Sequence, residues 1–358
     1  MVESATKEKV LLKGTDAVGQ AAILAGCEHY YGYPITPQNE IPEYMSRELP
    51  KVGGVFLQSE SEVSSINMVF GAACAGKRVM TSTSGPGYSL MAEGLSNVAG
   101  TELPTVVVLT SRGGPGGGNL ESTQLDYLCT TRGNGHGGYR NIVLAPASVQ
   151  EMFDLTQLAF DLADKYGIIV VVMVDGTLVQ MMEPVEARRV TLGEPLPPKP
   201  WAITGKRGRA ERNLIASCWP VPGTSQVFWD KLTAKYQAIK EQEVRCEVRD
   251  LDDADVIVVA FGLVSRLALG GVEMAREQGI KVGMIRPITL WPFPFATING
   301  AALPGREFLV VEGNMGQMLE DVDHAVRGQC PIAFLGQSTS FVSPVKVFEE
   351  IKRLAAKD

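Results

Sequence analysis

The sequence predicts an α/β protein built from two doubly wound domains with mostly parallel sheets. Short apolar runs alternate with longer segments of helical periodicity, the order typical of a parallel sheet covered by helices on both faces. The chain has 358 residues, which suits roughly two domains of about 150 residues each. A proline-rich stretch at 192–200 separates the two series of strands and helices. We therefore expect domains over 1–190 and 253–358, joined by a linker and connecting helix over 191–252.

The elements expected in the first domain follow from apolar spacing and residue type. A helix over 16–25 is expected to end near Gly26. Val63, Ile66 and Phe70 lie near helical spacing, and the run 105–110 is mostly β-branched, as in strands. The elements expected here are helices over 16–25, 62–75, 89–99 and 149–166 and strands over 55–57, 79–83, 105–110 and 168–174.

The second series of elements follows a segment rich in Lys and Glu over 225–249, which we interpret as a connecting helix. Beyond it we expect strands over 256–260, 282–285, 308–311 and 332–334 and helices over 267–278 and 343–356. Ser343 is a suitable N-cap for the last helix, and Pro344 suits its first position.

Composition excludes several classes of function. A net charge of -7 argues against a general nucleic-acid surface, which needs clustered Lys and Arg. The six cysteines form no CxxC pair and the chain has three histidines, so we expect no metal or iron–sulfur site within it. No apolar run reaches the ~20 residues of a transmembrane helix. The charged first ten residues and the scattered thiols predict a cytoplasmic protein without membrane association.

Four polar segments follow predicted strands of the first domain, where ligands of parallel α/β folds collect. Thr36 stands between two prolines, Glu62 heads a helix, 82–88 is expected to form a compact loop, and Arg112 precedes a glycine-rich run. Taken singly, each also has a purely structural interpretation. The Thr36 segment fits a rigid turn and Glu62 a favourable contact with the helix dipole, whereas 82–88 fits a tight turn and the glycine-rich run after Arg112 a flexible surface loop. Their shared position favours one joint site, with Arg112 suited to a carboxylate.

These residues, in this order, resemble the alpha subunits of 2-oxoacid:ferredoxin oxidoreductases, and most closely the 2-oxoisovalerate, or branched-chain, type. The resemblance covers nearly the whole chain. Its matching stretches are GYPITPQNEIPEYM (32–45), ESEVSSINMVFGAACAG (60–76), TSGPGYSLMAEG (83–94), SRGGPG (111–116), GGYRNIVLAPASVQEM (137–152), RPITLWPFP (286–294) and VEGNMGQM (311–318).

The resemblance implies thiamine diphosphate chemistry. It makes 1–190 a pyrimidine-binding domain and 253–358 a domain like the C-terminal domain of transketolase. The family's glutamate, which bonds N1′ of the aminopyrimidine, maps to Glu62, nine residues before Gly71; Glu60 is the second choice. Thr36 maps to a substrate-contacting threonine and Arg112 to the arginine that holds the substrate carboxylate. The expected cofactor contacts besides Glu62 are Pro34, Ile35, Ser84, Gly85 and Pro86.

The implied activity is oxidative decarboxylation of a 2-oxoacid, such as 2-oxoisovalerate, to an acyl-CoA, CO2 and reduced ferredoxin. The sequence lacks both a cluster motif and the Gly-Asp-Gly…Asn-Asn element that binds the diphosphate through Mg²⁺. The resemblance therefore places Mg²⁺ and [4Fe-4S] clusters on partner chains: a beta subunit, a gamma subunit and a ferredoxin-like delta subunit. It also implies a dimer of heteromers that reduces an external ferredoxin or another acceptor.

Several alternatives stay open at this point. The same chemistry on 2-oxoglutarate or an aryl 2-oxoacid is one, and for a second carboxylate the sequence offers Arg132 and Arg140. A non-catalytic docking subunit of such a complex is another. Arg286 and the turn at 312–314 belong either to internal packing or to an interface or coenzyme A approach.

Overall fold

The computed structural model describes residues 9–206, 208–218, 223–338 and 341–356, and its contacts divide the chain into two compact units. The first unit comprises 1–110, 148–172 and 177–216, and the second comprises 111–147, 173–176 and 217–358. The charged N-terminal residues 1–8 lie outside the described ranges.

The sheet of the first unit has its strands in the order β7, β5, β4, β2, β3. Strand β4 runs parallel to β5 and to β2, and β2 runs parallel to β3. Every residue of β4, β5 and β7 is buried, as expected for central strands covered on both faces. The bounds are β2 His29–Gly32, β3 Val55–Gln58, β4 Val79–Ser84, β5 Thr105–Ser111 and β7 Ile169–Asp175; β1 Val10–Lys13 and β8 Met182–Val185 form a separate antiparallel pair.

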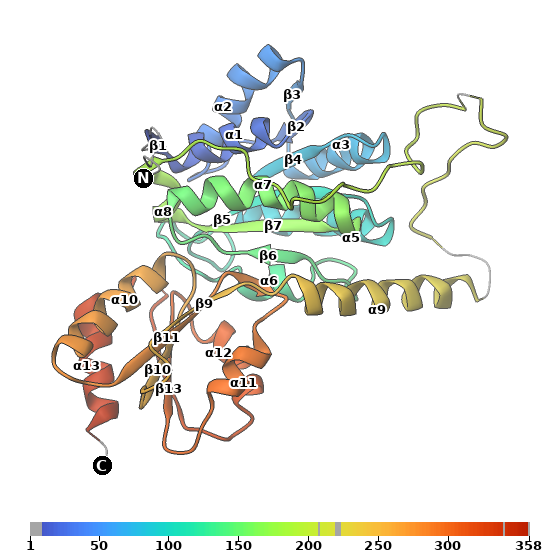
Figure 1. Cartoon of the computed structure of the whole chain (residues 1–358). Coiled ribbons are helices and arrows are strands. Elements are labelled where there is room, and N and C mark those ends of the chain that lie inside the picture. Colours follow the sequence, from blue (N-terminus) through green and yellow to red (C-terminus); the bar gives the residue numbers. More distant parts are fainter. Residues whose placement is uncertain (1–8, 207, 219–222, 339–340, 357–358) are drawn as a thin grey trace, which may run out of the picture. The chain divides into compact units, whose positions relative to one another are not determined.

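Helices of the first unit pack in pairs, α1 on α7 and α3 on α5 (Figure 1). Helix α7 spans Val149–Tyr166, the predicted bounds, and begins at the N-cap Ser148. The other helices are α1 Gly14–Leu24, α2 Glu40–Glu48, the 3-10 helix η1 Leu49–Val52, α3 Glu62–Cys74, α4 Gly85–Leu90, α5 Ala92–Gly100 and α8 Gly176–Gln180.

The proline-rich segment runs beside α7 without forming a helix or strand of its own. Lys199 forms an ion pair of 2.6 Å with Asp164, and the Leu192 N–H donates to Asp161. Arg78, which precedes β4, bridges Asp161 and Asp164 at 2.6 and 2.8 Å. This largely buried network holds the extended segment on the helix.

The second unit contains a five-stranded sheet in the order β14, β13, β10, β11, β9. The first four strands are parallel and β9 is antiparallel, so the sheet is mixed. Helices α10 and α13 cover one face of this sheet, and α11 and α12 cover the other (Figure 1). The bounds are β9 Cys246–Arg249, β10 Val256–Val259, β11 Val282–Pro287, β13 Glu307–Glu312, β14 Ile332–Gly336, α10 Gly262–Glu277, α11 Phe295–Ala301, α12 Gln317–Val326 and α13 Pro344–Ala355.

The rest of the second unit adds a two-stranded antiparallel ladder and two helices. Strand β6 (Ile142–Leu144) pairs with β12 (Thr289–Trp291), and the helices are α6 (Tyr127–Thr131) and α9 (Thr224–Gln242). Ser343 caps α13 as predicted, because its hydroxyl accepts a hydrogen bond from the Lys346 N–H.

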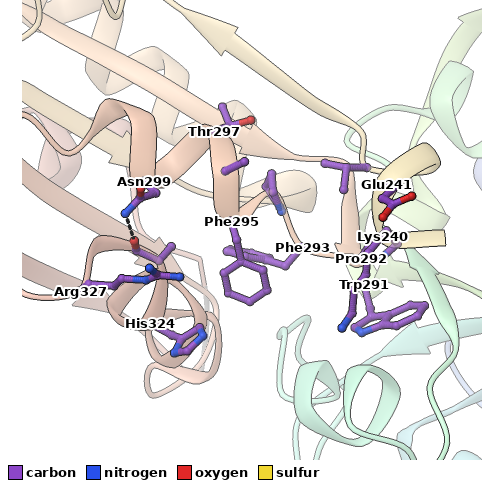
Figure 2. Close-up of a pocket in the computed structure, with 14 residues that line it drawn as sticks. Lys240, Glu241, Trp291, Pro292, Phe293, Phe295, Thr297, Asn299, His324 and Arg327 are labelled. Atoms are coloured by element: carbon purple, nitrogen blue, oxygen red, sulfur yellow. Dashed lines mark hydrogen bonds between the residues drawn. The ribbon is translucent and has the colours of Figure 1, made fainter. Parts of the chain in front are cut away.

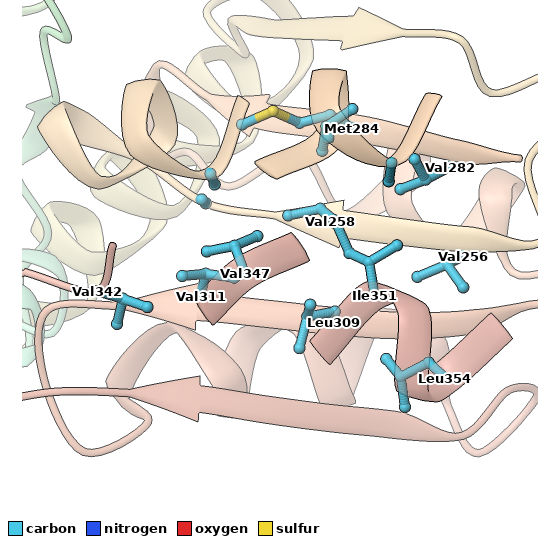
Figure 3. Close-up of a cluster of buried hydrophobic side chains, with 14 of the residues drawn as sticks. Val256, Val258, Val282, Met284, Leu309, Val311, Val342, Val347, Ile351 and Leu354 are labelled. Atoms are coloured by element: carbon cyan, nitrogen blue, oxygen red, sulfur yellow. The ribbon is translucent and has the colours of Figure 1, made fainter. Parts of the chain in front are cut away.

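Alternation along the strands creates the core beneath α10 and α13 (Figure 3). Val256 and Val258, two residues apart on β10, point to the same face as Leu309 and Val311 on β13. Ile351 of α13 closes this cluster, which is fully buried. Burying five such aliphatic side chains stabilises the unit by about 1.5–3 kcal/mol each.

The α/β class with mostly parallel sheets is confirmed, but several local predictions differ from the structure. Helix α10 begins at Gly262, five residues before the helix expected over 267–278. The helix expected over 225–249 ends at Gln242, because Cys246–Arg249 pairs with β11 as an edge strand. The compact loop expected over 82–88 does not exist, because β4 continues to Ser84 and α4 begins at Gly85.

Candidate functional site

Glu62 is the first residue of α3 and is buried, with a relative exposure of 3%. The preceding Ser61 caps the helix by accepting a hydrogen bond of 3.3 Å from the Ser64 N–H, which fixes where the helix begins. Within the described ranges the Glu62 carboxylate has no hydrogen bond and no ion pair. A buried carboxylate without a protein donor is unusual, and a bound ligand is one way to satisfy it.

The Glu62 carboxylate lies directly against the backbone of Gly87 in α4. A Cβ atom placed on Gly87 would stand 2.5 Å from Glu62 Oε1 and 2.8 Å from its Cγ, and it would also meet the Thr83 hydroxyl. Only glycine leaves room for the carboxylate at this point. The structure therefore brings Glu62 together with the junction between β4 and α4.

Hydroxyl side chains line this junction at the carboxyl end of β4. Ser82, Thr83 and Ser84 are fully buried, and the Ser84 hydroxyl has no hydrogen-bond partner among the described residues. Gly85 and Pro86 are half-buried and start α4 at once. The predicted residues Ser84, Gly85 and Pro86 thus immediately precede Gly87, whose backbone lies against the Glu62 carboxylate.

The loop after β2 carries Thr36, whose side chain is exposed, between exposed Pro34 and half-buried Pro37. Gln38, fully buried, donates its side-chain amide to the Tyr33 carbonyl at 3.4 Å, and its backbone N–H bonds to Ile35. The amide of Gln180 donates to the Pro37 carbonyl at 2.5 Å. These contacts hold the Thr36 loop from both sides.

A buried chain of hydrogen bonds links this loop to β4. The Ser82 hydroxyl donates to Gln38 Oε1 at 2.5 Å and lies 2.6 Å from the Tyr30 hydroxyl. Sequence patterns do not identify Tyr30 or Gln180, which lie outside the matching stretches; Gln38 lies within the stretch 32–45, but nothing local indicates its partner Ser82. Ser82 stands within the predicted segment 82–88, but its partners Tyr30 and Gln38 lie 52 and 44 positions earlier in the chain. No local pattern reports contacts over such separations.

Arg112 follows β5 and belongs to the second unit. Its guanidinium donates to the Gly117 carbonyl at 3.2 Å, and its backbone pairs with Ser122, so the glycine-rich loop closes on itself. Asp126 accepts hydrogen bonds from the Ser111 hydroxyl, at 2.7 Å, and from the Arg112 N–H. Burial raises the pKa of Asp126 to about 6, although these bonds and the Arg112 charge oppose the shift.

The predicted residues thus fall in two groups. Glu62 and Ser84–Pro86 lie together in the first unit, and the Gln38–Ser82 bond ties the Thr36 loop to the same strand. Arg112 is held within the second unit. Glu60, the second choice, is exposed, and its carboxylate accepts hydrogen bonds from Ser61 and Ser64.

A hollow of about 660 Å³ in the second unit lies apart from the predicted site residues (Figure 2). Phe293, Phe295 and Trp291 line it, with His324 against Phe295 at 5.4 Å between ring centroids. Its cations include Lys240, in the last turn of α9, where a positive charge stabilises the helix dipole. We therefore ascribe the charge of Lys240 to the end of α9.

Two further observations concern metal ligands and long apolar helices. In 9–206, 208–218, 223–338 and 341–356 no three His, Cys, Asp or Glu side chains gather in a way that could hold a metal ion. Over those same ranges no helix combines the length and the apolar character that crossing a bilayer requires.

Two family models match the chain. The model described as "Pyruvate flavodoxin/ferredoxin oxidoreductase, thiamine diP-bdg" matches residues 20–243. The model described as "Pyruvate:ferredoxin oxidoreductase core domain II" matches residues 254–352. Together they span both series of strands and helices.

Curated relatives extend along nearly the whole chain. The ketoisovalerate oxidoreductase subunit VorB of Methanothermobacter marburgensis is 49% identical over 315 residues, covering 88% of this chain and 89% of the relative. The 2-oxoglutarate synthase subunit KorA of the same organism is 36% identical and covers 92% of this chain and 94% of its own length.

A solved structure shares the fold. The 2-oxoglutarate:ferredoxin oxidoreductase from Magnetococcus marinus, with 2-oxoglutarate, coenzyme A and succinyl-CoA bound, superposes with a TM-score of 0.84 at 28% identity. The match covers 98% of this chain and 66% of that longer chain.

Proposed function

Because the chain belongs to the pyruvate flavodoxin/ferredoxin oxidoreductase family, we propose that it is the pyrimidine-binding alpha subunit of a thiamine diphosphate-dependent 2-oxoacid:ferredoxin oxidoreductase. The proposed reaction converts a 2-oxoacid and coenzyme A to an acyl-CoA, CO2 and reduced ferredoxin. The observation that carries the catalytic role is the buried Glu62 carboxylate, which lies against Gly87 without a partner in the described part of the chain.

The residues around Glu62 fit the aminopyrimidine ring of thiamine diphosphate. The carboxylate offers an acceptor for a proton at N1′ of the ring, and the buried Ser84 hydroxyl, at the end of β4, lacks a partner in the described ranges. Bound thiamine diphosphate supplies the electron sink for decarboxylation. Glu62 holds and exchanges the N1′ proton in a site screened from bulk water, a setting suited to general acid–base catalysis.

The remaining predicted residues receive roles in the same proposal. Pro34 and Ile35, in the braced loop after β2, contact the cofactor, and the Thr36 hydroxyl bonds oxygen atoms of the substrate. The Arg112 guanidinium holds the substrate carboxylate, a geometry for which arginine is suited because it donates two parallel hydrogen bonds. The hydrogen bonds of Gln38 and Gln180 support this role for Thr36, because they fix its loop.

We propose a branched-chain 2-oxoacid, 2-oxoisovalerate, as the substrate. The relative at 49% identity is a ketoisovalerate oxidoreductase subunit. The two arginines that the sequence offers for a second carboxylate are engaged elsewhere: Arg132 pairs with Asp321 at 2.7 Å, and Arg140 donates to the Arg132 carbonyl at 2.6 Å. These contacts favour a monocarboxylic substrate over 2-oxoglutarate.

Partner chains complete the proposed enzyme. We place the diphosphate and Mg²⁺ on a beta subunit, the [4Fe-4S] clusters on a ferredoxin-like delta subunit, and a gamma subunit beside them, in a dimer of heteromers. The proposal rests on the absence of a Gly-Asp-Gly…Asn-Asn element and of paired cysteines in the sequence. Coenzyme A enters as co-substrate, in keeping with the coenzyme A bound to the Magnetococcus enzyme.

The test replaces Glu62 by glutamine in the complex assembled with its partner chains. Loss of a general acid–base group costs about 10²- to 10⁴-fold in rate. We expect kcat with 2-oxoisovalerate to fall within this range while the complex assembles normally. Glu60→Gln is the matched control, because Glu60 stands two residues away and is exposed, and its activity should stay within about twofold of wild type.

Titration of each complex with thiamine diphosphate, followed by calorimetry, separates cofactor binding from turnover. Wild-type kcat in Glu62→Gln would overturn the assignment and favour a docking subunit without a catalytic role. Loss of activity in Glu60→Gln alone would transfer the role to Glu60.

A further inference from the structure

The sheet of the second unit has a switch point, a position between two strand ends where ligands bind in many parallel sheets. In this chain the side chain of Gln124 occupies that position. From β10 the chain passes to β11 on one side and later to β13 on the other, in the order β14, β13, β10, β11. The carboxyl ends of β10 and β13 therefore flank the point where the strand order reverses. In open parallel sheets, ligands bind at this point.

Gln124 occupies this position and is fully buried. Its side-chain amide donates to the Phe261 carbonyl, after β10, at 3.0 Å, and its Oε1 accepts from the Gly313 N–H, after β13, at 2.9 Å. Its backbone N–H bonds to the Gly313 carbonyl at 2.8 Å, and its carbonyl accepts from the Asn314 amide at 3.0 Å. Every polar group of the residue is used.

Two glycines permit this close approach. Gly262, with φ +56, starts α10, and a Cβ there would stand 2.9 Å from Gln124 Nε2 and would also meet the Asp175 carboxylate. A Cβ on Gly313 would stand 3.2 Å from Gln124 Cγ. In nucleotide-binding folds, glycines at strand ends likewise leave space for the nucleotide to approach the backbone. Here the approaching group is an internal side chain.

Two buried carboxylates, Asp175 and Glu312, accept hydrogen bonds from the first turns of α10 and α12, on either side of Gln124. Asp175 accepts hydrogen bonds from the Leu263 N–H, at 2.6 Å, and from the Gln124 amide. Glu312 accepts hydrogen bonds from the N–H groups of Met318 and Leu319, which lie in the first turn of α12. Burial raises the pKa of Asp175 and of Glu312 to about 7. The turn at 312–314 therefore serves internal packing in the second unit.

Gln124 sits at the root of the loop that carries Arg112. Ser122, two residues earlier, pairs with the Arg112 backbone, and Asp126, two residues later, accepts hydrogen bonds from Ser111 and Arg112. Within this segment Gln124 is the residue that bonds to the ends of β10 and β13, through Phe261 and Gly313.

We propose that Gln124 is a positioning residue that holds the Arg112 loop, through its bonds at the ends of β10 and β13, in the geometry that binds the substrate carboxylate. This inference rests on the role proposed above for Arg112. It also assigns the position between the ends of β10 and β13 to a side chain of the protein itself.

A double-mutant cycle in the assembled complex tests the inference. Gln124→Met keeps the length of the side chain and removes its hydrogen bonds. We expect KM for 2-oxoisovalerate to rise about tenfold with kcat within about threefold, as for loss of geometry at one charged contact. If Gln124 acts through Arg112, the same change in an Arg112→Ala background raises KM by less than about twofold.

Asn141→Ala is the matched control for a lost buried amide. Asn141 is fully buried in the same unit, where its Nδ2 donates to the Thr130 carbonyl at 3.1 Å. We expect a comparable loss of melting temperature with unchanged KM. A rise of KM in this control equal to that in Gln124→Met would overturn the inference, because it would show a general effect of destabilisation.

Hydrogen exchange gives a readout that does not depend on substrate. The N–H of Gly113 bonds to Glu121 and that of Asn119 bonds to Gly113 within the loop. Both amides should exchange faster in Gln124→Met and not in Asn141→Ala. Unchanged exchange, or KM effects that multiply in the double variant, would overturn positioning by Gln124. An unchanged KM in Arg112→Ala alone would instead overturn the proposed role of Arg112, even if exchange increases as expected.

Discussion

Replacing Gly87 by alanine adds one methyl group directly against the carboxylate of Glu62. The new Cβ would overlap the Thr83 hydroxyl and would stand 2.5 Å from Glu62 Oε1 and 2.8 Å from Glu62 Cγ, whereas ordinary contacts begin at 3.4 Å. Oε1 must therefore move by about 0.9 Å, the difference between 3.4 and 2.5 Å. A misplacement of about 1 Å costs about 10²-fold in rate when a reacting group depends on orientation. The same overpacking costs about 1–3 kcal/mol of stability.

The assay measures kcat and KM of the assembled Gly87→Ala complex, with its melting temperature. We expect kcat to fall about 100-fold while the complex remains folded at 25 °C. Gly300→Ala is the control, because a Cβ on this helical glycine of α11 meets nothing within 4 Å. It should keep full activity and gain up to about 1 kcal/mol in stability. Wild-type kcat in Gly87→Ala would refute the view that the position of Glu62 matters.

Two further predictions concern stability. Burial raises the pKa of Asp175 from 3.8 to about 7, so the fold favours its protonated form, and wild type loses this stabilisation as pH rises between these two values. At ~1.4 kcal/mol per pH unit the loss is about 4 kcal/mol. The difference in melting temperature between Asp175→Asn and wild type should therefore increase in favour of the variant as pH rises from 5 to 8. A difference that does not change with pH would contradict this prediction. Ser343→Ala removes the N-cap bond to Lys346 and should cost about 1 kcal/mol in urea unfolding at constant pH, whereas an unchanged midpoint would show that the cap contributes nothing.

Local patterns predicted the elements whose signals lie within one segment. Helix α7 begins at a serine N-cap and ends at Gly167, which adopts the left-handed conformation typical of helix ends, so its bounds are visible in sequence. The end of α9 is not, because β9 forms only by pairing with β11. That pairing joins Arg249 to Met284, 35 positions later, and no local pattern reports it.

The candidate site was predictable only in part for the same reason. Glu62, Thr36 and Arg112 stand in recognisable motifs after strands. Gln124 stands in no motif, and Asp175 is simply the last residue of β7, with no local pattern that marks it. Their relation emerges only where β10 and β13 end side by side, with Gly262 and Gly313 leaving space for the glutamine.

The most direct test of the central claim is an experimental structure of the assembled complex with thiamine diphosphate bound. The distance from the Glu62 carboxylate to N1′ of the aminopyrimidine is the quantity to measure. We expect about 2.6–3.0 Å, a hydrogen bond to a charged group, with Gly87 in contact with the same carboxylate. An aminopyrimidine bound elsewhere, or a Glu62 carboxylate more than about 4 Å from N1′, would contradict the proposal.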